Sequence, residues 1–323
     1  MQEKNYTELE RAIIATFCYF DSFDYPLTLM EIEKWLFTDN GGRKYSIAEI
    51  LEALEQSPVV SGKIETEKGF YFLHGRDGIV EVRKQRYRLA EGKMKKAVRV
   101  AKALRYIPFV NMIAVCNNLA YNNASNLSDI DVFVILKQDR LWQTRFFVSV
   151  VTHLMRMRRH HRLVSNRVCL SFYVTDGHLD LEKLMIQPLD PYFIYWYGQL
   201  VPIYDHQNNF NNLIAANKWI EKYLPNLIIN KPVLRRSVKD TKQSLAIKRI
   251  METMLGGSFG NFVEKIMKNI QKRKMISNKK SKMWEKSTAV IIQDDILKFH
   301  ENDRRKMYAE KFISKLNSEL YSE

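Results

Sequence analysis

The sequence predicts an α+β protein in three parts: a small region of helices and a hairpin, a mixed-sheet core, and a helical C-terminal region. Three observations predict this. Apolar residues recur at helical spacing before residue 57 and again beyond residue 188. Residues 108–187 instead alternate apolar runs of strand length with helical segments. Hydrophobic residues make up 46% of the 323 positions, which is enough to build packed cores.

The N-terminal part, residues 1–76, predicts three short helices and then a hairpin. Apolar residues have helical spacing over 6–20, 27–37 and 47–54. Strand-forming residues follow over 58–64 and 69–73, on either side of a polar turn. This order is that of a winged helix-turn-helix, so a winged-helix-like domain is expected.

The third predicted helix is acidic, with Glu49, Glu52 and Glu55. DNA phosphates would repel such a helix in the major groove, so this domain is expected to contact a protein partner or the rest of the chain. A connecting helix follows over 77–107. It carries ten basic residues, which either hold RNA or DNA or form a solvated face: Arg83, Lys84, Arg86, Arg88, Lys93, Lys95, Lys96, Arg99, Lys102 and Arg105.

The net charge of +15 is unevenly distributed along the chain. Residues 1–100 contain as many acidic as basic residues, so the whole excess lies beyond them. A basic excess indicates an anionic partner, which is a nucleotide, a nucleic acid or an acidic membrane surface. The alternative is a charge that serves solubility alone.

Cysteine usage and hydropathy favour the cytoplasm. Cys18, Cys116 and Cys169 are far apart and odd in number, which supports neither a zinc site nor a disulfide framework. The first ten residues are polar, unlike a signal peptide, and no apolar stretch reaches the length of a membrane span. A cytoplasmic protein with no integral membrane segment is therefore expected.

The core, residues 108–187, predicts a small sheet. Strands are expected over 110–116, 130–136 and 167–174. A short helix over 119–123 lies between the first two, and a longer helix over 140–157 separates the second and third.

Asp129 and Asp131 are the residues of the core that point most directly to chemistry. They are two apart at the start of a β-run, and residues i and i+2 of a strand face the same side. Two adjacent carboxylates repel each other unless a cation neutralises them, and Mg²⁺ binds through one or two carboxylates together with substrate phosphates. This pair predicts a site for Mg²⁺ (or Mn²⁺) that supports phosphoryl chemistry.

The surrounding segment, 110–136, resembles the active-site segment of the DNA polymerase β nucleotidyltransferase superfamily. The shared pattern is an apolar strand, a turn of small residues, about ten further residues, and Asp-x-Asp within a β-run. The resemblance implies that Asp129 and Asp131 are catalytic and bind metal, and that Asn117, Asn118 and Ser128 contact the nucleotide. The implied reaction transfers a nucleotidyl group from an NTP to a hydroxyl acceptor of unknown identity.

A weaker resemblance covers most of the chain. Residues 12–27, 140–145 and 298–305 are similar to an uncharacterised group of bacterial nucleotidyltransferase-domain proteins with a winged-helix-like region at the N-terminus. That resemblance implies no known substrate.

The sequence departs from the superfamily pattern twice. Asn117 and Asn118 stand where the superfamily has Gly-Ser, although Asn tolerates the left-handed backbone and its amide donates hydrogen bonds. The third predicted strand has no acid to serve as base: Ser171 lies near the expected position, and Asp176 lies past the strand. The alternative function is therefore a catalytically impaired protein of this fold that binds nucleotide or nucleic acid as a regulator.

Basic residues after the second strand are expected to hold an anionic acceptor such as RNA. They are Arg156, Arg158, Arg159 and Arg162. A solvated basic turn is the alternative.

The C-terminal part, 188–323, is expected to be helical over 191–199, 210–223, 239–274 and 302–320, with a break at Gly256 and Gly257. Residues 289–292 are expected to form a strand or an anchored extension. The aromatic residues of 192–197 predict a helix interface. The basic amphipathic segment 259–274 is expected to pack on the chain itself; RNA or an acidic membrane surface is the alternative partner.

Overall fold

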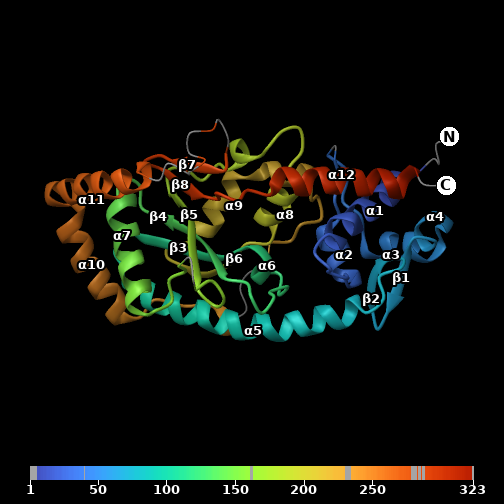
Figure 1. Ribbon diagram of the computed structural model, residues 1–323, viewed down its shortest axis with the longest axis horizontal. Helices are drawn as coiled ribbons and strands as arrows, with labels where there is room; N and C mark the ends of the chain where they lie inside the picture. The colour runs from blue at the N-terminus through green and yellow to red at the C-terminus, as the bar shows by residue number, and fades with distance from the viewer. Residues whose placement is uncertain are drawn as a thin grey trace.

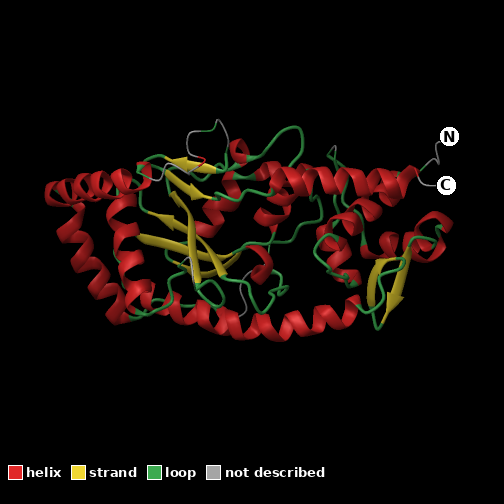
Figure 2. Cartoon of the chain, in the orientation of Figure 1, coloured by secondary structure: helices red, strands yellow, loops and turns green. Residues whose placement is uncertain are grey.

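The computed structural model describes residues 6–39, 41–160, 163–229, 234–277, 282, 285 and 288–321. The fold is α+β, as predicted. A six-stranded mixed sheet lies at the centre with helices around it, and a separate two-stranded hairpin lies at one end (Figure 1, Figure 2).

The N-terminal region has the predicted order of helices and hairpin. Its elements are α1 (Glu8–Asp21), α2 (Leu29–Trp35), α3 (Ile47–Gln56), α4 (Pro58–Ser61), β1 (Ile64–Glu67) and β2 (Phe70–Leu73). Thr7, Thr28 and Ser46 begin the first three helices, each in a capping box with a glutamate three residues later. The prediction of a strand over 58–64 is wrong: the Ser57 hydroxyl caps α4, and Pro58 suits a first helical turn.

Helix α5 (Ile79–Leu104) is the predicted connecting helix. It runs from the hairpin along one side of the molecule to the sheet (Figure 1). Its Arg83 pairs with Glu31 of α2 at 2.7 Å, and its Arg86 pairs with Asp24 after α1 at 3.0 Å. These pairs fix the N-terminal region to the helix that leads to the core.

The centre of the sheet is formed by the three predicted strands, β3 (Val110–Val115), β4 (Ile130–Leu136) and β5 (Val168–Thr175). Strands β3 and β4 are antiparallel, whereas β4 and β5 are parallel and joined through α7 (Leu141–Leu154). The short helix α6 is Asn117–Ala120, so it begins two residues earlier than predicted.

The C-terminal region is mainly helical, as expected, but it also completes the sheet. The strand order is β6-β3-β4-β5-β8-β7, with β6 (Val201–Asp205), β7 (Val290–Ile292) and β8 (Ile296–Phe299). Strands β6 and β8 were not predicted. Strand β6 contains Pro202, which is tolerated because the strand lies at the sheet edge.

The predicted C-terminal helices are present with one interruption, and two 3₁₀ helices of three residues each were not predicted. In chain order the helices are η1 (Glu182–Leu184), α8 (Pro191–Gly198), α9 (Asn209–Ala216), η2 (Lys218–Lys222), η3 (Leu234–Arg236), α10 (Lys242–Gly256), α11 (Ser258–Ile276) and α12 (Arg305–Tyr321). The single helix predicted over 210–223 is interrupted at Asn217, whose buried side chain bonds to the backbone of Leu179, Leu181 and Leu213 instead.

The two faces of the sheet have separate cores. Alternate residues such as Ile113, Val132 and Val134 face the cluster that includes α5 and α7. Met112, Phe133 and Ile135 face the cluster that includes α1, α8 and α12. Strand alternation places Asp131 on this second face, below α8. No helix in the described part of the chain is long and apolar enough to span a bilayer.

Candidate active site

Asp129, Asp131 and Cys169 form a cluster at one end of the central strands. Asp129 immediately precedes β4, Asp131 is its second residue, and Cys169 lies beside Asp131 in the parallel register of β5. One oxygen of each carboxylate and the Cys169 Sγ all lie within 4.8 Å of one another. Among the described residues, no other three side chains of metal-ligand type gather this closely.

The two carboxylates share one positively charged neighbour, Arg159, which pairs with Asp129. Burial, together with the neighbouring Asp129, raises the pKa of Asp131 to about 6, although hydrogen bonds from Asn117 and Cys169 and the charge of Arg159 act in the opposite direction. A carboxyl group with this pKa is mostly ionised at neutral pH but becomes protonated in mildly acidic solution. A divalent cation would favour ionisation of both groups, and a pair of carboxylates is a donor set that Mg²⁺ and Mn²⁺ accept.

Asn117 adjoins the carboxylates from the end of β3. Its backbone is left-handed, with φ of 54°, a conformation that Gly adopts freely and Asn adopts more readily than most residues. The preceding Cys116 N–H donates to the Asp131 carbonyl at 3.2 Å, which holds this turn against β4. Asn118 is exposed, and its side-chain oxygen accepts from the Tyr121 hydroxyl at 2.8 Å.

Tyr192 of α8 is a site residue that the sequence did not reveal. Its hydroxyl donates to the Asn117 Oδ1 at 3.2 Å, which leaves the Asn117 amide nitrogen for the Asp131 carboxylate. The aromatic residues of this segment predict a helix interface, with base stacking as the alternative, and the burial of α8 confirms the interface.

The Ser128 side chain makes its hydrogen bond within its own loop. Its hydroxyl donates to the Ser125 carbonyl at 2.9 Å, and the Ser128 carbonyl accepts from the Lys93 ammonium of α5 at 2.7 Å. Lys96, one turn further along α5, donates to Asn166 at 2.9 Å. Two lysines of α5 therefore support the loops beside the carboxylates.

The predicted arginine cluster is dispersed. Arg159 pairs with Asp129 at 2.6 Å and thus belongs to the carboxylate cluster. Arg158 lies near Tyr173 and Arg145 on the α7 side of the sheet, where its positive charge acts to lower the pKa of both groups. Arg156 is exposed, and Arg162 lies outside the described residues.

The resemblance predicts a third carboxylate on β5, near Ser171. In the structure Cys169 of β5 is the residue beside Asp131. Burial, together with Asp131, raises the pKa of Cys169 to about 12, so without a bound metal its thiol stays protonated near neutral pH and does not act as a base. Ser171 instead lies 3.3 Å from the His300 Nε2. Asp176 is remote, because its carboxylate binds Asn111 and the Gln138 N–H at the opposite end of the strands.

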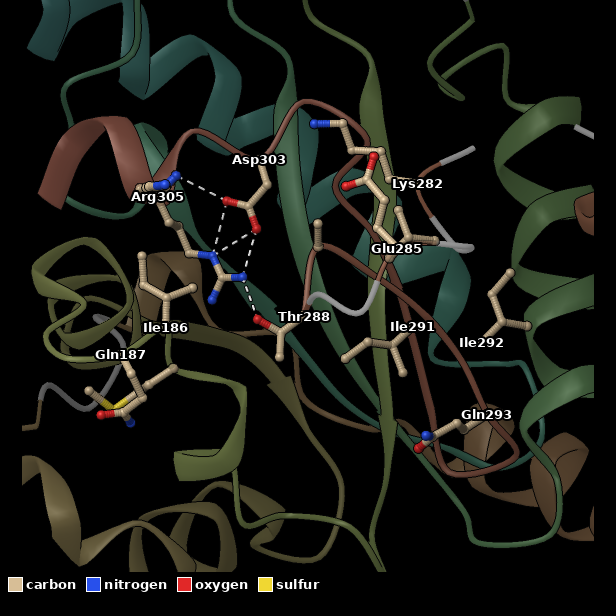
Figure 3. Close-up of a pocket in the computed structure, with 14 residues that line it drawn as sticks. Ile186, Gln187, Lys282, Glu285, Thr288, Ile291, Ile292, Gln293, Asp303 and Arg305 are labelled. Atoms are coloured by element: carbon tan, nitrogen blue, oxygen red, sulfur yellow. Dashed lines mark hydrogen bonds and ion pairs between the residues drawn. The ribbon is translucent and has the colours of Figure 1, made fainter. Parts of the chain in front are cut away.

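A cavity of about 860 Å³ lies beside β7, and its lining includes neither Asp129 nor Asp131. Its charged wall includes Arg305, which bonds to Asp303 and to the Thr288 hydroxyl (Figure 3). Arg305 also donates to Asp190 and to the Leu184 carbonyl. Because its guanidinium is held by protein acceptors, this cavity offers no free arginine for a substrate.

Comparison with known proteins gives no independent guide to this site: no family model, no curated protein and no solved structure matches the chain.

Proposed function

We propose that this chain is a nucleotidyltransferase-like protein that transfers a nucleotidyl group from an NTP to a hydroxyl acceptor. The observation that carries the proposal is the position of Asp129, Asp131 and Asn117 together at the ends of β3 and β4. Asp129 and Asp131 would hold Mg²⁺ or Mn²⁺. When bound, such a cation neutralises phosphate charge and stabilises the oxygens of the displacement.

The protein's own groups orient the nucleotide in this proposal. The left-handed turn at Asn117 and the exposed amide of Asn118 present polar groups beside the carboxylates. Tyr192 fixes the Asn117 side chain, and Lys93 holds the loop that carries Ser128. Arg159 supplies a positive charge next to Asp129 and lies within reach of incoming phosphates once that pair opens.

An anionic acceptor such as RNA is favoured by the exposed face of α5. Arg88, Lys95, Arg99 and Lys102 are exposed, and their spacing of seven, four and three residues places them in one stripe. Lys96 lies beside this stripe and contacts Asn166, close to the carboxylate cluster. A groove of about 360 Å³ between α5 and η3 is lined by three of these residues and by Arg235.

Label transfer tests the proposal. The protein is incubated with each α-labelled NTP and Mg²⁺ or Mn²⁺, and label is sought on cellular RNA, on protein and on the chain itself. Transfer that disappears in the Asp129→Ala, Asp131→Ala variant supports the proposal and identifies the nucleotide. Transfer that persists in this variant contradicts it.

A second candidate is a catalytically impaired regulator that binds nucleotide or nucleic acid. Cys169 favours it, because a protonated thiol stands beside Asp131 where a base is needed. The N-terminal region would recruit a protein partner, since α3 exposes Glu52 and Glu55 to solvent. NTP binding without transfer under any of the above conditions favours this candidate.

A further inference from the structure

Helix α11 carries an apolar stripe that no part of the described chain covers. Phe259, Phe262, Ile266 and Ile270 are spaced three, four and four residues apart, so they lie on one side of the helix. Phe259 and Phe262 are each 61% exposed. The prediction that segment 259–274 packs on the chain itself holds for the opposite side of the helix only.

Helix α10 carries a similar stripe. Ile247, Ile250 and Met254 are exposed at spacings of three and four residues. The two helices meet at Gly257 and form the end of the molecule opposite the N-terminal region (Figure 1). Exposed apolar side chains concentrated on two adjacent helices indicate a surface that binds something else.

The inner sides of both helices are already used. Glu252 accepts from the Phe109 N–H at 2.8 Å. Glu264 accepts from the N–H groups of Trp142 and Gln143 at 2.8 and 2.9 Å, where it caps α7. These contacts fix which sides of α10 and α11 face the protein.

The same contacts leave no acid of α10 or α11 on the outer surface; Asp294, after β7, pairs with Lys268 beside it. Glu252 and Glu264 are the only acids between residues 242 and 277, and both bond to the backbone inside the molecule. The exposed charges of the two helices are all positive: Lys242, Arg249, Lys265, Arg273 and Lys274. The outer surface thus combines uncovered apolar groups with cations.

We infer that the outer surface of α10 and α11 docks on an anionic lipid bilayer. Apolar side chains of such a surface enter the boundary between headgroups and acyl chains, while lysines and arginines bind lipid phosphates. A second copy of the chain would place these cations opposite one another, and neither helix exposes an acid to pair with them. Nucleic acid would pair the cations but leave the phenylalanines in water. This inference is independent of the proposed nucleotidyl transfer.

Vesicle flotation of the full chain tests the inference. Vesicles of phosphatidylcholine mixed with phosphatidylglycerol are expected to bind the protein, and vesicles of phosphatidylcholine alone are not. Added salt should weaken the binding. The Phe259→Ser, Phe262→Ser variant should bind at least about tenfold more weakly, because both substitutions remove apolar surface that would leave water on binding. Both phenylalanines are exposed, so this variant should retain the wild-type urea midpoint.

The control is Met30→Ser, which removes an equally exposed apolar side chain from α2 and should leave vesicle binding unchanged. Arg273→Gln, Lys274→Gln should weaken binding and reduce its salt dependence. Absence of binding to anionic vesicles overturns the inference, and so does binding that survives the phenylalanine substitutions. A dimer in solution that these substitutions dissociate would assign the surface to a second copy instead, which also overturns it.

Discussion

Two acidic clusters on the same side of the sheet differ in how their charges are balanced. Burial alone would raise the pKa of Asp303, but the hydrogen bonds and charge of Arg305 outweigh it and hold that pKa at about 2. Burial and the neighbouring Asp129 instead raise the pKa of Asp131 to about 6. The first cluster contains its own cation. The second holds two carboxylates and a single half-exposed arginine, Arg159.

This difference separates a structural cluster from a candidate binding site. Arg305 is almost fully buried and joins Asp303, Asp190 and the Leu184 carbonyl, which connects the start of α12 to the start of α8. At the Asp129–Asp131 cluster the described residues form one ion pair, between Asp129 and Arg159. The excess negative charge of the cluster is what a divalent cation would neutralise.

The largest expected effect is on the structural cluster. Arg305→Met leaves the carboxylates of Asp190 and Asp303 buried without their partner, and should lower the free energy of unfolding by about 3–5 kcal/mol. Urea unfolding measures this. The neighbouring Lys306→Met, at an exposed position, should have little effect. Equal effects of the two substitutions would show that the Arg305 network is not structural.

The next effect concerns the missing base. Cys169→Asp places a carboxylate beside Asp131 and, with Mg²⁺ present, should raise the rate of nucleotidyl transfer by about 10²-fold, the lower end of what a general base contributes. Cys169→Ser is the matched control and should leave the rate near that of the wild type. If neither variant changes the rate, Cys169 does not occupy the position of the base.

A smaller effect should appear in the dependence of stability on pH. The pKa of Asp131 is raised on folding, so its contribution to stability is present below about pH 4 and is lost as pH rises through about 6. Mn²⁺ at a hundredfold excess over Kd should therefore stabilise the protein at pH 8 by about 2–3 kcal/mol, and less at pH 5. Thermal unfolding at both pH values provides the test, and an equal shift in Tm would argue against binding at Asp131.

The smallest effect is that of neutralising single acids without metal. At pH 8, Asp131→Asn removes a repelled charge and should leave stability unchanged or raise it by about 1 kcal/mol. Asp303→Asn removes the partner of Arg305 and should lower stability. Urea midpoints of the two variants compare the clusters directly. Similar losses in both would contradict the distinction between them.

Local sequence signals predicted most of the elements. Apolar periodicity located α1 and α7. Asp129 and Asp131 are close because residues i and i+2 of a strand share a face. Strands β6 and β8 were missed because each is short and is defined by pairing with a distant strand. No local pattern contains that information.

The missed parts of the candidate site have the same origin. Cys169 lies beside Asp131 only through the parallel register of β4 and β5, and a bulge after Asp131 shifts that register. Tyr192 reaches Asn117 from a helix 75 residues further along the chain. The two carboxylates were therefore predictable from one strand, whereas the positions of Cys169 and Tyr192 beside them depend on the tertiary structure.

The central claim is that Asp129 and Asp131 bind a divalent cation together with an NTP. Electron paramagnetic resonance of Mn²⁺ tests it most directly, because the method distinguishes free from bound Mn²⁺. Both are measured with and without ATP. We expect the protein to bind Mn²⁺ at pH 8. With ATP present, more Mn²⁺ should be bound than the Mn²⁺–ATP complex in solution accounts for. Both the binding without ATP and this increase should disappear in the Asp129→Asn, Asp131→Asn variant. Mn²⁺ binding that is unchanged in this variant would contradict the claim.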